Sequence, residues 1–179
     1  MKIPKEFPQF DDEKAIFIVT GKQTAVFHLA YKGNLIELAE FKIEYPSYPD
    51  KEGFSMNRGK GMTFGFGWVL EDKKQEKAKD FLRVLEDAGK DILKKHDASK
   101  IYLFSPKYVL ADAKETIRKI APNKVEVRTF SGNYTRTHPK KLLNELKERN
   151  KRRVEKNKVT VIKEEARKIL EKTKNIRGS

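Results

Sequence analysis

The sequence has 179 residues, enough for one domain with a hydrophobic core, and its 40 Lys and Arg against 26 Asp and Glu give a net charge of +14. Cysteine is absent, which excludes a disulfide framework, a thiol nucleophile and any cysteine-ligated metal site. The apolar run Ala15–Val19 is far shorter than the ~20 residues that span a bilayer, and the first residues do not resemble a signal peptide. These features predict a soluble, cytoplasmic protein with no membrane contact and a polyanionic partner.

The positive charge is concentrated at the end of the chain. Residues 140–179 contain 15 Lys or Arg and 6 Glu, a net charge of +9, whereas residues 1–139 have a net charge of +5. Electrostatic screening acts over roughly 8–10 Å at physiological salt, so a local excess matters more than the total. The excess favours contact with nucleic-acid phosphates, because neutralised phosphates release counterions. A solvated helical surface is the alternative interpretation.

Three strands are expected at the start of the chain. Ala15–Thr20 is rich in β-branched and aromatic residues, and Thr24–Tyr31 follows it after a short turn as a hairpin partner. A second turn at Gly33-Asn34 leads to Leu35–Tyr45, which alternates between apolar and polar residues from Leu38 onward. The pattern predicts an antiparallel meander.

Residues 46–67 break every periodicity, with two prolines and five glycines. About twenty residues without a regular pattern is long for a compact domain, and such loops are commonly functional or disordered. Flexible backbone, cations and large apolar side chains suit insertion into a groove of RNA or protein, and a disordered surface loop is the alternative. The candidate residues of this loop are Gly53, Gly59, Gly61, Met62 and Phe64, together with the cations Arg58 and Lys60.

Helices and strands alternate in the next part of the chain. The apolar spacing predicts a helix over Glu71–His96, a buried strand at Lys100–Phe104 and a second helix to Ile120 with Ser105 as its N-terminal cap. An alternating strand follows at Lys124–Phe130. A meander followed by crossover units predicts an α/β fold with a mixed sheet.

The last part of the chain is expected to be helical and mostly outside the core. A helix near Pro139, capped by Thr137, places its leucines against the sheet. The polar run after Arg149 has little to bury, and Val159–Lys172 can form a separate amphipathic helix. We therefore expect an α/β domain over residues 1–150 and a basic helical C-terminal extension over residues 151–179.

The sequence offers few groups for catalysis. None of His28, His96 and His138 has metal-ligand spacing with another histidine or a carboxylate, so neither a metal ion nor a cofactor is expected. We expect His28 to be packed in the sheet and His138 to cap a helix or lie at the surface. The loop sequence Arg58-Gly59-Lys60-Gly61 lacks the spacing and the Lys-Ser/Thr ending of a nucleotide-binding P-loop.

Two blocks of the sequence resemble a known family. They are AIFIVTGKQTAVFHLAYKGNLIELAEF and AKDFLRVLEDAGKDILKKHDASKIYLFSPKYVLADAKETIRKIAPNKVEVRTFSGNYTRTHPKKLLNELKER, within residues 13–150. They are similar to the bacterial and archaeal relatives of the central domain of class-1 peptide-release factors, including host-attachment proteins, and to the related factors Pelota and Balon. The resemblance implies a ribonuclease-H-like mixed α/β fold.

The resemblance fails at the residue that matters for peptide release. In release factors the loop between the third strand and the long helix carries Gly-Gly-Gln, which reaches the peptidyl-transferase centre. The matching loop here reads Arg58-Gly59-Lys60-Gly61-Met62 and has no glutamine. The resemblance therefore does not imply hydrolysis of peptidyl-tRNA by this chain, and no catalytic residue is expected.

The leading hypothesis is a non-catalytic, ribosome-associated factor of the hibernation or rescue type, at a tRNA or peptidyl-transferase site of idle or stalled ribosomes. Its partners would be the ribosome and ribosomal RNA, with tRNA as a further candidate. The alternatives are a general RNA- or tRNA-binding protein, a peptidyl-tRNA hydrolase or nuclease, and an adhesion protein. The candidate RNA-binding residues are Arg58, Lys60, Arg136, Lys140, Lys141, Arg149, Lys151, Arg152, Arg153, Lys156 and Lys158.

Overall fold

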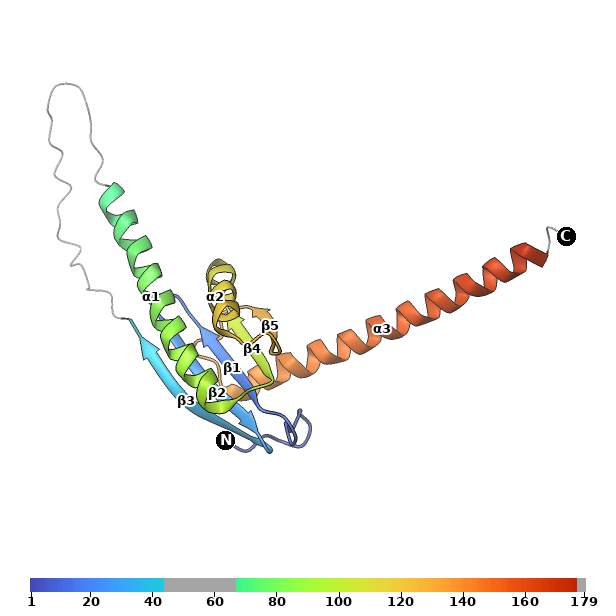
Figure 1. The fold of residues 1–179 in the computed structure, drawn as a ribbon, viewed down its shortest axis with the longest axis horizontal. Coiled ribbons are helices and arrows are strands. Elements are labelled where there is room, and N and C mark those ends of the chain that lie inside the picture. Colours follow the sequence, from blue (N-terminus) through green and yellow to red (C-terminus); the bar gives the residue numbers. More distant parts are fainter. Residues whose placement is uncertain (44–66, 177–179) are drawn as a thin grey trace, which may run out of the picture.

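A five-stranded mixed sheet lies at the centre of the fold in the computed structural model, which describes residues 1–43 and 67–176 (Figure 1). The elements are β1 Ala15–Thr20, β2 Thr24–Tyr31, β3 Asn34–Lys42, α1 Gly67–His96, β4 Lys100–Ser105, α2 Lys107–Ile120, β5 Glu126–Ser131 and α3 Pro139–Ile176. All expected strands are present, each within three residues of its expected start and end among the described residues. The candidate loop residues between 46 and 66, and the expected end of the third strand at Tyr45, lie outside the described residues.

The sheet has the strand order β3-β2-β1-β4-β5. β2 is antiparallel to both β1 and β3, whereas β4 is parallel to β1 and β5 is parallel to β4. A meander followed by two parallel crossovers confirms the mixed α/β fold. The two edges of the sheet are β3 and β5.

The two faces of the sheet have different cores. On one face α1 and α2 cover an aliphatic core that includes Ile16, Leu85 and Ile117 (Figure 1). On the other face the N-terminal segment and the first turns of α3 cover a row of aromatic rings. In this row the ring of Phe104 stacks between those of Phe17 and Phe130, with centroids 5.9 and 4.4 Å away. The stacked pair of Phe104 and Phe130 joins β4 to β5, and the pair of Phe17 and Phe104 joins β1 to β4.

The turn between β2 and β3 is shifted by one residue from the expected Gly33-Asn34. Tyr31 pairs with Asn34, so Lys32 and Gly33 are the two central residues, and their φ angles are +47° and +67°. Two positive φ values define a type I′ turn, whose twist matches that of the flanking strands. Gly33 meets this requirement without strain.

The expected caps of α2 and α3 are wrong. Ser105 is the last, buried residue of β4, and the residue before α2 is Pro106, which has no side-chain capping bond. At α3 the backbone N–H of Lys140 donates to His138 Nδ1 at 3.2 Å, so His138 caps the helix instead of Thr137. The capping role that the sequence suggested for His138 is confirmed.

α3 is one continuous helix of 38 residues, about 57 Å long. The expected interruption after Arg149 and the separate helix at Val159–Lys172 are therefore wrong. No glycine or proline occurs between Lys140 and Ile176, and most residues of the polar run are good helix formers. Only the first turns of α3 lie against the sheet, and the helix then projects far beyond it (Figure 1).

Candidate nucleic-acid interface

The side of α3 that faces the sheet changes from leucine to arginine along the helix. Leu142 and Leu146 are buried in the aromatic core. The same three- and four-residue spacing continues through Arg149, Arg153 and Lys156, which are exposed. Residues at this spacing share one helix face. The change occurs where α3 passes the edge strand β5 and leaves the sheet.

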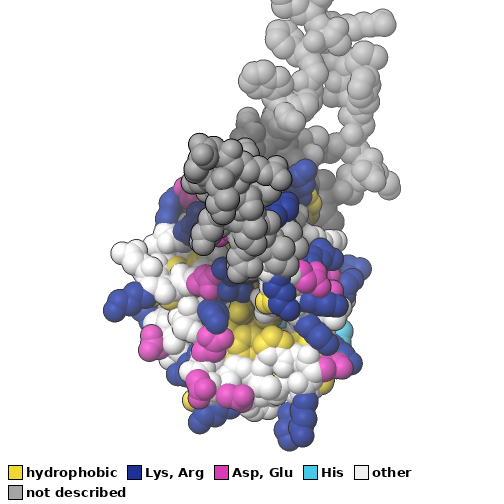
Figure 2. All heavy atoms as spheres, turned by 90° about the vertical axis from the view of Figure 1, so that its right-hand side faces the viewer, with side chains coloured by type: hydrophobic (Ala, Val, Ile, Leu, Met, Phe, Trp, Pro, Cys, Tyr) yellow, Lys and Arg dark blue, Asp and Glu magenta, His cyan; other side chains and the backbone are white. Residues whose placement is uncertain are grey.

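A cleft of about 470 Å³ lies between β5 and α3. Its lining includes five cations and a single carboxylate, so it is strongly positive. The lining residues are Glu126, Arg128, Thr129, Phe130, Leu146, Arg149, Asn150, Arg152, Arg153 and Lys156. Figure 2 shows the side of the molecule towards which α3 projects, where Lys and Arg side chains, interspersed with Asp and Glu, surround a patch of hydrophobic side chains.

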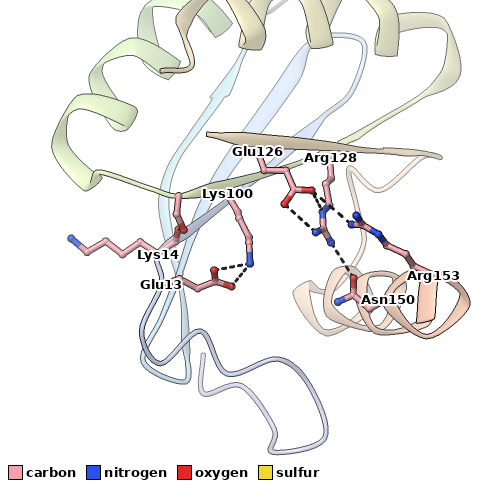
Figure 3. A network of polar contacts seen from close by, with 8 residues as sticks. Glu13, Lys14, Lys100, Glu126, Arg128, Asn150 and Arg153 are labelled. Carbon is pink, nitrogen blue, oxygen red and sulfur yellow. Dashed lines mark hydrogen bonds and ion pairs between the residues drawn. The ribbon is translucent and has the colours of Figure 1, made fainter. Parts of the chain in front are cut away.

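A polar network joins the two walls of the cleft (Figure 3). The guanidinium of Arg128 donates two hydrogen bonds to the Glu126 carboxylate, at 2.8 and 3.0 Å, and a third to Asn150 Oδ1 at 3.1 Å. Arg153 lies 3.9 Å from the same carboxylate. The hydrogen bond from Arg128 lowers the pKa of Glu126, so this carboxylate is ionised and offsets part of the positive charge.

Arg149 is held in place by the edge strand. Its guanidinium donates a hydrogen bond to the carbonyl oxygen of Thr129. The same group lies over the ring of Phe130, 4.7 Å from the ring centroid, in a cation–π contact. Two independent contacts already orient the guanidinium. The side chain of Arg149 would therefore lose little conformational entropy when a ligand binds to it.

Two other cations of the cleft, Arg152 and Lys156, differ from Arg149 and Arg153 in their contacts. Arg152 and Lys156 form no ion pair or hydrogen bond through their side chains within residues 1–43 and 67–176. We define the basic stripe as Arg149, Arg153, Lys156, Lys163 and Arg167, all exposed and all at three-, four- or seven-residue spacing. The stripe is about 27 Å long at 1.5 Å per residue. It extends the positive cleft along the projecting half of the helix.

The structure brings together some of the predicted RNA-binding residues. Arg149, Arg152, Arg153 and Lys156 line the cleft, whereas Lys151 and Lys158 are exposed on α3 without lining it. Arg136, Lys140 and Lys141 precede or begin α3 and do not line the cleft, and Lys140 lies 3.8 Å from Glu6. Arg58 and Lys60 lie outside the described residues.

Local sequence patterns do not reveal the half of the cleft that β5 supplies. Arg128 and Phe130 belong to the alternating segment that predicted the strand β5. That alternation does not show that β5 is an edge strand beside α3. Near the start of the chain, Glu13 forms an ion pair with Lys100 at 2.6 Å.

Among the described residues no three His, Asp or Glu side chains are grouped closely enough to hold a metal ion. In the same part of the chain, no helix combines the length and the apolar character needed to cross a membrane.

Comparison with known proteins gives only distant similarity. No protein-family model matches the chain, and no curated protein matches it in sequence. Among solved structures, an archaeal translation termination factor is similar at 15% identity and a TM-score of 0.39, over 68% of this chain and 32% of that chain. A type II variant of the Aquifex aeolicus Ppx/GppA phosphatase is similar at 14% identity and a TM-score of 0.34, over 65% of this chain and 36% of that chain.

These similarities concern the fold alone. The chain spans about a third of the length of each of these structures. At TM-scores below 0.5 they assign neither a family nor an activity to this chain, so the function is argued from its own surface.

Proposed function

We propose that this protein is a non-catalytic, ribosome-associated factor that binds ribosomal RNA through the β5–α3 cleft and the basic stripe, at a tRNA or peptidyl-transferase site of idle or stalled ribosomes. The observation that carries the proposal is the change from leucine to arginine on one face of α3. Arginine and lysine replace leucine where the helix leaves the sheet, so this face is suited to a polyanion outside the fold.

The dimensions of the basic stripe fit a nucleic-acid backbone. The basic stripe places five cations along about 27 Å of helix, so it can contact several successive phosphates of a nucleic-acid strand. Arginine binds phosphate through a planar fork of N–H donors, and the exposed guanidinium groups of Arg152 and Arg153 can approach it from α3. The release-factor resemblance of the sequence favours ribosomal RNA over other polyanions.

The test is co-sedimentation with ribosomes at increasing salt. We expect the triple variant Arg152→Gln, Arg153→Gln, Lys156→Gln to lose affinity and to show a flatter salt dependence, with a slope reduced by about 2 to 3. The matched control is Lys79→Gln, Lys94→Gln, Lys95→Gln, which removes three exposed cations from α1. Equal losses in both variants would show a nonspecific charge effect and would overturn the assignment of the interface.

The non-catalytic part of the proposal has its own test. We expect no release of labelled peptide from programmed ribosomes at saturating protein, because the loop that would reach the reaction centre has Lys60 and no glutamine. Release that increases with protein concentration and disappears in Lys60→Ala would show that the chain is an enzyme.

A further inference from the structure

A second hollow, of about 260 Å³, adjoins the positive cleft but has a different chemical character. Its lining is Phe130, Ser131, Tyr134, Glu145, Glu148, Arg149 and Arg152. Phe130, Arg149 and Arg152 line both spaces, so Arg149 stands between them. The two carboxylates of the lining balance its two arginines, so this hollow is less favourable for a phosphate than the positive cleft.

The wall of the hollow is aromatic and well ordered. The ring of Tyr134 is buried and packs edge-on against Phe104, with centroids 5.1 Å apart. Gly132 allows this position, because a Cβ atom there would lie 2.7 Å from Tyr134 Cε2. Burial, and next the Glu145 carboxylate, raise the pKa of Tyr134, so its hydroxyl remains a hydrogen-bond donor.

Arg149 offers a flat surface at the boundary of the hollow. Its guanidinium carbon lies over the Phe130 ring, 4.7 Å from the centroid, and the residue as a whole is exposed. Unpaired RNA bases stack on guanidinium planes and aromatic rings of this kind. A purine or pyrimidine ring therefore finds an apolar and cationic surface here.

The two carboxylates are available to a ligand. Glu145 and Glu148 each precede an arginine by four residues, a spacing that favours ion pairs on a helix. Neither pair forms among the described residues, and Arg149 contacts β5 instead. Carboxylate oxygens accept hydrogen bonds from the exocyclic amino group of a base.

We propose that this hollow binds one unpaired RNA base with an exocyclic amino group, such as cytosine, while the neighbouring phosphates lie in the β5–α3 cleft. The inference rests on the proposed RNA binding and adds a base preference to it. Uracil presents a carbonyl where cytosine presents the amino group, so it would face the carboxylates with an acceptor and be disfavoured.

The test compares two single-stranded RNAs that differ in this group alone. Oligo(C) and oligo(U) of equal length are titrated into the full-length protein at neutral pH, and binding is followed by fluorescence anisotropy. We expect oligo(C) to bind roughly fivefold to tenfold more tightly. In the double variant Glu145→Gln, Glu148→Gln, the ratio of the two affinities should fall towards one, because an amide can also donate to uracil.

The control is Glu115→Gln, which removes a carboxylate from α2, where it pairs with Lys119. It should leave the ratio of affinities unchanged. If the double variant unfolds, Glu148→Gln alone serves, since Glu148 is exposed. Equal affinity for the two RNAs, or a ratio that the glutamine variants do not change, would refute the base site while ribosome binding stands.

Two other outcomes distinguish the proposals. If the wild-type protein does not bind ribosomes at all, the proposed function itself is refuted. Free cytidine monophosphate should bind far more weakly than oligo(C), because it has no neighbouring phosphates for the cleft. Equally tight binding of the mononucleotide would identify a nucleotide site and would overturn the inference of an RNA base.

Discussion

The inner and outer parts of α3 belong to one helix but have different surroundings. The inner part, to about Arg149, inserts Leu142, Leu143 and Leu146 into the aromatic core. In the outer part the described side chains beyond Asn150 are exposed, and Val154, an apolar residue, is 54% exposed. The inner part is built by hydrophobic burial, whereas the described side chains of the outer part bury almost nothing.

This difference separates stability from binding within one element. Burial stabilises the fold and depends little on salt, whereas exposed cations contribute little to stability and bind anions with a strong salt dependence. Changes in the inner part should therefore change unfolding, and changes in the outer part should change affinity. Four predictions test this separation, from the largest expected effect to the smallest.

The largest effect is expected for Leu146→Ala. This side chain is 1% exposed between the helix and the sheet, so its removal leaves a cavity. We expect the free energy of unfolding to fall by about 2–5 kcal/mol. The measurement is urea denaturation, with Lys151→Ala one turn further along as the control. A similar loss in both variants would mean that the outer part also supports the fold.

Removal of residues 151–179 tests the outer part. We expect ribosome affinity to fall on the order of 100-fold and the slope of its salt dependence to flatten by about 3, because four cations of the basic stripe are lost. Unfolding should change by less than about 0.5 kcal/mol. Affinity is measured by pelleting at two salt concentrations. Unchanged binding would reject the role of the outer helix.

Glu126→Gln tests whether charge in the cleft sets the affinity for ribosomes. The Glu126 carboxylate belongs to β5, but its negative charge offsets the positive charge of Arg153 on α3. The change removes the negative charge that Arg128 and Arg153 share. We expect ribosome affinity to rise by up to about fivefold, since the exposed parts of such pairs are worth ~0.2–1 kcal/mol. Glu115→Gln on α2 is the matched control. A loss of affinity would show that Glu126 positions the arginines instead of offsetting them.

The smallest expected effect is the pH dependence of the free energy of unfolding, and it arises in the sheet and not in α3. His28 is buried in β2, its Nδ1 has no partner among the described residues, and burial lowers its pKa although Glu37 acts in the opposite direction. The unfolded chain then binds a proton near pH 6.5 that the folded chain does not, so stability falls as pH decreases below about 6.5.

This pH dependence can be isolated by substitution. His28→Gln should flatten the slope of unfolding free energy between pH 7 and pH 5. The slope is measured by urea denaturation at several pH values. The ribosome affinity of the folded protein should be the same in the wild type and in His28→Gln at each pH, because His28 does not line the cleft. A slope that persists in His28→Gln would assign it to other groups.

Local patterns were sufficient to predict the sheet, because each strand carries its own signal. β-branched and aromatic runs identified β1 and β2, and the alternation of apolar and polar residues identified β5. The register of the β2–β3 turn was missed by one residue, since Lys32 in the left-handed region has no strong sequence signal. The continuity of α3 was missed because its polar run buries nothing, although its helix propensity is high.

The candidate interface was only half predictable. The cations of α3 stand together in the sequence, so Arg149, Arg152 and Arg153 could be proposed from charge alone. Arg128 and Phe130 lie about twenty residues earlier and join them only because β5 is the edge strand beside α3. The proximity of these β5 and α3 residues depends on tertiary packing, which cannot be predicted from local sequence patterns.

The contact between Arg149 and the carbonyl of Thr129 has a consequence for the behaviour of the protein in concentrated solution. Edge strands expose backbone groups that can pair with another chain and start aggregation. β5 is short, and among the described residues no strand pairs with its outer side. The guanidinium of Arg149 occupies one of its carbonyl groups and brings a positive charge to the edge. The same arginine therefore discourages two molecules from joining their sheets.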